Sequence, residues 1–201
     1  HRYILTSSEV WIMRKKVLIL GINGQDGSLL SDYLLTKDYD VFGTYNHLNE
    51  KTKVNINKNF NKLTLYRCDL MQSGDLEEVL KTNEFSEIYH LAAITFVPDS
   101  LNNAELVMKV NAYSLQTIME YVAANTPKTK VFYASSAEVF AQAEGAMTEK
   151  SPFEPMSAYG LSKVVGQNLI EYYQRKGLYC CYGILFNLSL IHISEPTRLG
   201  M

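Results

Sequence analysis

The chain has 201 residues, of which 47% are hydrophobic and 20% are charged, and its formal net charge is −2. This composition is that of an ordinary globular protein, and it excludes a disordered chain, which would be poorer in apolar residues and more strongly charged. Eleven glycines and five prolines exclude a collagen-like repeat, and the near-neutral charge gives no support to a nucleic-acid partner, which would need a basic surface.

Short apolar runs alternate along the chain with segments of helical periodicity. We predict strands at 17–20, 40–44, 63–68, 87–91, 130–135 and 178–186, and helices at 28–37, 73–81, 104–124 and 157–176. Residues 46–61 are rich in Asn and Lys, and they are interpreted as a surface loop. This alternation predicts an α/β fold, a doubly wound, Rossmann-like parallel sheet with helices on both faces. In such a sheet ligands bind beyond the carboxyl ends of the strands.

A glycine-rich segment connects the first predicted strand to the first helix. It has the spacing G-x-x-G-x-x-G, which differs from the commonest dinucleotide fingerprint. Glycine lets the backbone approach a pyrophosphate closely, and the following helix offers free N–H groups to it. The segment therefore predicts a cofactor site, although a glycine turn without a ligand remains an alternative. Its candidate residues are Gly21, Asn23, Gly24, Gln25, Asp26 and Gly27.

The choice between NADP and NAD depends on the residues after the second strand. An acid there would bind the ribose 2′-hydroxyl of NAD, and an Arg would bind the 2′-phosphate of NADP. The sequence offers no acid there, which favours NADP, and no Arg, which leaves NAD open. Further candidates follow the third and fourth strands: Asp69 and Leu70, and the small-residue run Leu91, Ala92 and Ala93. Asp69 could bind the adenine amino group or act only as a loop or capping residue.

A Tyr-x-x-x-Lys pair on one helix face can support proton transfer. A cationic Lys is expected to lower the pKa of a nearby phenol, which can then exchange a proton with a substrate hydroxyl. The pattern is weak by itself because it occurs three times, at 33/37, 159/163 and 172/176. Only Tyr159 and Lys163 begin a helix that follows the polar loop after the fifth strand, so these two are the predicted catalytic pair. They are also candidates for cofactor binding.

Two polar residues at the end of the fifth strand complete the candidate catalytic set. Ser136 can hydrogen-bond a reacting oxygen, and Glu138 can act as an acid or a base. Each also has a simpler interpretation, as a strand-end Ser and a solvated Glu. No metal site is expected, because the three cysteines Cys68, Cys180 and Cys181 lack metal-ligand spacing. They suit a reducing cytoplasm, and no apolar run reaches the about 20 residues of a membrane span.

Together these motifs resemble the extended short-chain dehydrogenase/reductases, and among them the GDP-mannose 4,6-dehydratases. The resemblance rests on the glycine segment, YHLAA at 89–93, SSAEVF at 135–140, SAYGLSK at 157–163 and GILFN at 183–187. It implies that GDP-mannose is oxidised at C4 by NADP while Tyr159 removes the hydroxyl proton. Glu138 would assist loss of water across C5 and C6, and hydride would return to C6 to give a 4-keto-6-deoxy sugar. It also implies a homo-oligomer for the intact protein.

The two ends of the chain fit this resemblance poorly. Residues 1–12 show no signal-peptide pattern, and Met13 precedes a basic stretch and the first strand, so 1–12 is expected to be an extension and 13–187 the cofactor domain. Residues 188–201 resemble one reading frame of a sequencing adapter rather than the family's substrate region. We therefore expect a non-native tail and a missing substrate domain. The alternatives are a keto-sugar reductase or nucleotide-sugar epimerase, or an inactive cofactor-binding fragment.

Overall fold

A computed structural model describes residues 14–95, 103–140, 147–148 and 150–186. The predicted extension at 1–12 and the predicted tail at 188–201 lie outside the described residues. None of the helices in the described part is long and apolar enough to cross a membrane.

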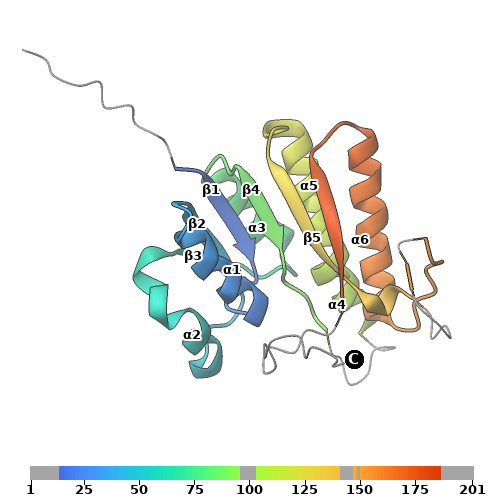
Figure 1. The fold of residues 1–201 in the computed structure, drawn as a ribbon, viewed down its shortest axis with the longest axis horizontal. Helices are drawn as coiled ribbons and strands as arrows, with labels where there is room; N and C mark the ends of the chain where they lie inside the picture. Colours follow the sequence, from blue (N-terminus) through green and yellow to red (C-terminus); the bar gives the residue numbers. More distant parts are fainter. Residues whose placement is uncertain (1–13, 96–102, 141–146, 149, 187–201) are drawn as a thin grey trace, which may run out of the picture.

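The described residues form one parallel sheet of six strands in the order β3-β2-β1-β4-β5-β6 (Figure 1). The strands are β1 Lys16–Leu20, β2 Asp40–Tyr45, β3 Thr64–Arg67, β4 Glu87–His90, β5 Lys130–Ser136 and β6 Cys180–Leu185. Every neighbouring pair is parallel. All six predicted strands are confirmed, and the order reverses between β1 and β4, where doubly wound sheets bind ligands.

Helices cover both faces of the sheet, as predicted. They are α1 Gln25–Leu35, α2 Glu50–Ile56, α3 Ser73–Lys81, α4 Ala104–Met108, α5 Ser114–Asn125 and α6 Ala158–Arg175, with 3-10 turns η1 Asn57–Lys62 and η3 Ala137–Val139. Alternate residues of β1 point to opposite faces. Leu18 and Leu20 pack with α3, α5 and α6, whereas Val17 and Ile19 pack with α1 and α2.

Two segments differ from the prediction. The prediction of a surface loop at 46–61 is wrong, because α2 and η1 occupy most of this segment and Ile56 is buried against the core. Two apolar side chains four residues apart, Ile56 and Phe60, anchor this polar segment on the sheet. The helix predicted at 104–124 is interrupted by one π-helical turn, η2 Lys109–Tyr113, between α4 and α5. Such turns often lie at functional sites.

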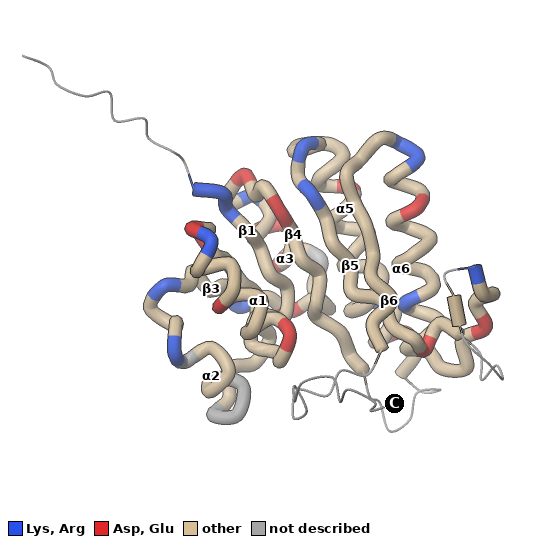
Figure 2. Tube along the Cα trace, viewed as in Figure 1, with Lys and Arg blue, Asp and Glu red and all other residues tan. Residues whose placement is uncertain are grey.

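Charged residues lie mainly at the ends of the elements. In the view of Figure 2, positions of Lys and Arg are interspersed with those of Asp and Glu, and most of the sheet carries neither. The interior of the sheet is apolar, so the buried polar side chains that do occur are exceptions that need an explanation.

Candidate active site

A tight glycine turn joins β1 to α1. Gly21 has a φ of +79°, and a Cβ on it would lie 2.9 Å from the Cα of Ala92. A Cβ on Gly27 would lie 2.3 Å from the carbonyl oxygen of Gly21. Both positions therefore require glycine for packing alone. Gly24 precedes α1 and has no side chain to cap the helix, so the first-turn N–H groups remain available to an anion.

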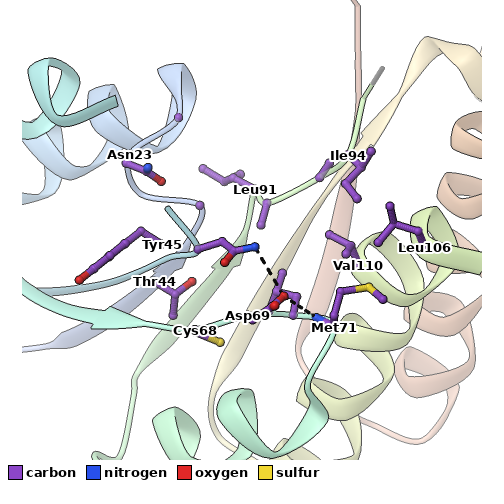
Figure 3. A pocket seen from close by; sticks show the side chains of 16 residues that line it. Asn23, Thr44, Tyr45, Cys68, Asp69, Met71, Leu91, Ile94, Leu106 and Val110 are labelled. Atoms are coloured by element: carbon purple, nitrogen blue, oxygen red, sulfur yellow. Dashed lines mark hydrogen bonds between the residues drawn. The ribbon is translucent and has the colours of Figure 1, made fainter. Parts of the chain in front are cut away.

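A cavity of about 340 Å³ lies beyond the carboxyl ends of β1 to β4 (Figure 3). Of the predicted cofactor residues, those that line it are Gly21, Asn23, Gly24, Asp69, Leu70, Leu91, Ala92 and Ala93. An adjoining hollow of about 260 Å³ shares Gly21, Gly24 and Leu91, and it is lined also by Gln25, Asp26 and Gly27. The structure thus brings these predicted cofactor residues together at the predicted edge of the sheet.

The cavity is nearly uncharged. Asp69 is the one charged side chain among the described residues that line it. Its carboxylate accepts hydrogen bonds from the backbone N–H of Met71 at 3.0 Å and from the Asn46 side chain at 3.5 Å (Figure 3). Asp69 therefore stabilises its own loop, and it also faces the space where an adenine amino group could bind.

The glycine turn is held in place from the segment that was predicted to be a loop. Asn55 of α2 donates a hydrogen bond to the backbone carbonyl of Asn23 at 2.9 Å, and the Asn23 side chain donates to the carbonyl of His47 at 2.9 Å. The sequence prediction missed this role for α2. The Asn-rich composition of the segment was the available signal, because amide side chains can bond backbone groups in loops.

The four predicted catalytic residues form a second group, around β5, η3 and the start of α6. The Ser136 side chain lies at the end of β5, near enough to the Tyr159 phenol to act on its pKa, and it accepts a hydrogen bond from the backbone N–H of Glu138 at 3.3 Å. Lys163 is buried, and its ammonium donates to the carbonyl of Ala134 at 2.8 Å. Glu138 is exposed on η3, close enough to Tyr159 to affect its ionisation. None of the four is among the residues that line the two hollows.

One local contact fixes the approach of α6 to η3. Ser157 caps α6 by accepting a hydrogen bond from the backbone N–H of Gly160 at 3.0 Å. A Cβ on Gly160 would lie 2.3 Å from the carbonyl oxygen of Glu138. The glycine beside Tyr159 therefore lets α6 begin directly against η3.

Asn111 connects the catalytic group to the cavity, and the sequence prediction missed it. It is fully buried in the π-helical turn η2. Its side chain accepts from the backbone N–H of Ile94 at 2.8 Å, in the cavity wall, and donates to the Ser162 hydroxyl at 3.0 Å, next to Lys163. A buried Asn in an otherwise apolar helix was the signal that could have identified it.

The pKa of Tyr159 is not lowered in this structure, contrary to the expectation from its pairing with Lys163. It is raised, because burial disfavours the phenolate and Glu138 adds a repulsive charge, although the Ser136 hydroxyl acts in the opposite direction. Burial also lowers the pKa of Lys163 from 10.5 to about 7. A lysine that is only partly protonated at neutral pH stabilises a phenolate weakly.

Solved structures with the same fold include an epimerase and a dehydratase. UDP-glucuronic acid 4-epimerase from Bacillus cereus, in complex with NAD, matches with a TM-score of 0.74 and 24% identity, over 86% of this chain and 56% of that one. dTDP-glucose 4,6-dehydratase from Bacillus anthracis, also in complex with NAD, matches with a TM-score of 0.69 and 21% identity, over 84% and 53%. At these identities the matches establish the Rossmann-like fold.

Sequence comparison is more specific. GDP-mannose 4,6-dehydratase from Vibrio cholerae is 33% identical over 190 residues, which cover 87% of this chain and 50% of the relative. The enzyme of Drosophila melanogaster is 34% identical over 188 residues, covering 86% and 47%. The chain thus spans about half the length of these relatives. The family model described as GDP-mannose 4,6 dehydratase matches residues 18–197, and the chain belongs to that family.

Proposed function

We propose that this chain carries the cofactor-binding and proton-transfer half of a GDP-mannose 4,6-dehydratase, which converts GDP-mannose into GDP-4-keto-6-deoxymannose. The observation that carries the proposal is the grouping of Ser136, Tyr159 and the buried Lys163, whose ammonium lies 5.4 Å from the Tyr159 ring, at the carboxyl edge of the sheet of a chain of this family. We infer GDP-mannose as the substrate from the relatives named above, which are GDP-mannose 4,6-dehydratases.

The glycine turn and its cavity fit a nicotinamide dinucleotide. Gly21, Gly24 and Gly27 line the hollows at the start of α1, whose free N–H groups suit a pyrophosphate. Asp69 would bind the adenine, and Leu91 to Ala93 would lie along the dinucleotide. When bound, the cofactor supplies a hydride acceptor and donor. We propose NADP, because the described cavity lining carries no acid after β2 to bind a ribose 2′-hydroxyl. NAD is the alternative, because the same lining carries no cation for a 2′-phosphate.

The chain's own residues would move the protons. Tyr159 would take the proton of the sugar C4 hydroxyl, with Ser136 hydrogen-bonded to the same oxygen. Lys163 would hold Tyr159 in place and favour its ionised form once protonated. Glu138 would remove the C5 proton and assist departure of the C6 hydroxyl as water. Its exposure at the mouth of the site is what an acid–base group that meets the substrate requires.

The first test is to incubate the 201-residue chain, and in parallel the longest form its gene encodes, with GDP-mannose and NADP. We expect a 4-keto sugar nucleotide from the longer form, detected by mass spectrometry, and none from its Tyr159→Phe variant. Binding of NADPH by the 201-residue chain without turnover would support the alternative of a cofactor-binding fragment for this chain. Failure of both forms to bind NADPH or NADH would contradict the proposal.

A second test separates the dehydratase from the alternatives of a reductase or an epimerase. A dehydratase needs an acid–base group at position 138, and a simple C4 epimerase does not. In the longest form, Glu138→Gln should abolish loss of water, whereas Glu154→Gln, at another exposed glutamate, should leave it intact. Normal loss of water in Glu138→Gln would remove Glu138 from the mechanism.

We also propose a cytoplasmic location and a homo-oligomeric assembly. The three cysteines are free thiols, with Cys68 and Cys180 buried and Cys181 exposed, which suits a reducing compartment. Sedimentation of the longest form would show the assembly, and a monomer at micromolar concentration would contradict it.

A further inference from the structure

The ammonium of Lys163 lies between two aromatic rings. Its Nζ is 5.4 Å from the ring centroid of Tyr159, on its own helix, and 4.8 Å from that of Tyr133, on β5. One of its hydrogens goes to the carbonyl of Ala134. Ring faces within about 6 Å attract a cation, and the attraction is stronger where water is excluded. Tyr133, on β5, therefore makes the shorter of the two cation–π contacts of Lys163.

Tyr133 is itself fixed by contacts on three sides. It is fully buried, and its hydroxyl donates a hydrogen bond to the backbone carbonyl of Asn111 at 3.0 Å. Its ring packs edge-on against His90, with centroids 5.5 Å apart. The space for its phenol comes from Gly166 on α6, where a Cβ would lie 2.3 Å from the Tyr133 ring. The glycine follows Lys163 by three positions and so lies on the same face of the helix.

Three other titratable groups lie around Lys163: His90 and Tyr133 are neutral, and Glu138 is exposed. Ser114 donates its hydroxyl hydrogen to the Val110 carbonyl at 2.6 Å, so its contact with His90 Nε2 at 2.6 Å must be donated by the histidine. Burial lowers the pKa of His90 to about 3, and burial raises the pKa of Tyr133. Glu138 faces Tyr159 from η3 and is exposed. Tyr133 thus faces the ammonium as a neutral ring.

We propose that Tyr133 is a positioning residue for Lys163: its ring holds the ammonium beneath Tyr159, and its hydroxyl fixes that ring on the π-helical turn of Asn111. The same turn contacts the cavity wall at Ile94, so Tyr133 links the lysine to the cofactor cavity. The inference rests on the proposed role of Lys163 in proton transfer. Its test measures Lys163 directly and does not depend on turnover.

The test is the titration of Lys163 by NMR in the 201-residue chain carrying ¹³C-labelled lysine, with the signal assigned from the Lys163→Met variant. Tyr133→Leu removes the ring, and we expect the pKa of Lys163 to fall by about one unit, the size of a desolvated cation–π contact. Tyr133→Phe keeps the ring and should shift the pKa by less than about 0.3. Tyr172→Leu, at the exposed tyrosine that faces Lys176, is the matched control and should leave Lys163 unchanged.

A fluorination series makes the test independent of folding in the leucine variant. Replacing Tyr133 by phenylalanines with one, two and three ring fluorines weakens the negative face of the ring and nearly preserves its volume. A stepwise fall in the pKa of Lys163 along the series supports the proposal. A pKa that is the same throughout the series overturns it, as does an equal shift in Tyr133→Phe and Tyr133→Leu. A failure of the proposed enzyme activity would leave this titration unaffected.

Discussion

Two Tyr-x-x-x-Lys pairs lie at the two ends of α6, with similar ring–ammonium distances and very different surroundings; Lys176 caps the carboxyl end of the helix. The lysine Nζ is 5.4 Å from the ring centroid in Tyr159/Lys163 and 5.0 Å in Tyr172/Lys176. A third pair, Tyr33/Lys37, begins in α1 and ends two residues beyond it, and its distance is 5.3 Å. The spacing alone therefore produces the contact, whether or not the pair has a function.

Burial and neighbours distinguish the two pairs. Lys163 is 2% exposed and bonded to the Ala134 carbonyl, whereas Tyr172 is 48% exposed and Lys176 faces solvent. The first pair begins α6 at the carboxyl end of β5, and the second ends α6 just before β6 starts. Position relative to the sheet, rather than the motif, thus decides which pair can meet a cofactor.

The largest expected difference between the pairs is in turnover. In the longest form encoded by the gene, Tyr159→Phe removes the proton-transfer group and should lower kcat about 10²- to 10⁴-fold. Tyr172→Phe should leave kcat unchanged. Formation of the 4-keto product, followed over time for both variants, checks this expectation, and equal rates would contradict it.

A smaller difference is expected in packing around the first pair. Gly166→Ala places a Cβ against the Tyr133 ring and should lower the free energy of unfolding by about 2–3 kcal/mol. Gly74→Ala on α3 is the matched control, because no heavy atom lies within 4 Å of the new Cβ. It should leave stability unchanged or raise it by less than about 1 kcal/mol. Urea denaturation measures the free energy of unfolding of both variants. A Gly166→Ala variant as stable as Gly74→Ala would contradict the expected clash with the Tyr133 ring.

The pH dependence of stability should also separate the two lysines. Burial lowers the pKa of Lys163 from 10.5 to about 7, so above pH 7 the unfolded chain binds more protons than the folded chain. Stability should therefore rise with pH across this window, by up to about 1.4 kcal/mol per unit. Lys163→Met should remove that rise between pH 7 and 9.5, and Lys176→Met should not. Parallel curves for wild type and Lys163→Met would contradict the burial of the lysine.

The smallest effect concerns the exposed pair itself. Cation–π contacts at solvent-exposed sites contribute about 0.5–1 kcal/mol at most. Lys176→Met should accordingly change the free energy of unfolding at pH 7 by less than about 1 kcal/mol. A loss above 2 kcal/mol in urea denaturation would show that the second pair is not a mere consequence of spacing.

Residue patterns predicted the regular parts of the molecule. The apolar runs identified all six strands, and the order of elements identified the edge at which the glycine turn and Asp69 meet. The strand predictions succeed because buried parallel strands need continuous apolar sequence. Helix α2 was missed because two apolar anchors in a polar segment carry little periodic signal, and only tertiary packing makes them helical.

The structure places the predicted catalytic pair, Tyr159 and Lys163, beside Ser136, but the electrostatics of the pair were not predicted. Pair spacing indicates a contact and says nothing of the burial that raises the pKa of Tyr159 and lowers that of Lys163. The roles of Asn111 and Tyr133 were missed for a related reason. Both depend on contacts between residues far apart in the sequence, such as the hydrogen bond from Asn111 to Ser162.

The central proposal is that, of the three Tyr-x-x-x-Lys pairs, only Tyr159/Lys163 takes part in the proposed cofactor site. Titrating the 201-residue chain with NADPH, by the change in cofactor fluorescence, tests it most directly when Lys163→Met and Lys176→Met are compared with wild type. We propose that Lys163 also donates a hydrogen bond to the bound cofactor, so Lys163→Met should weaken binding by at least about tenfold, and Lys176→Met should bind like wild type. Equal affinities for all three proteins would contradict the account.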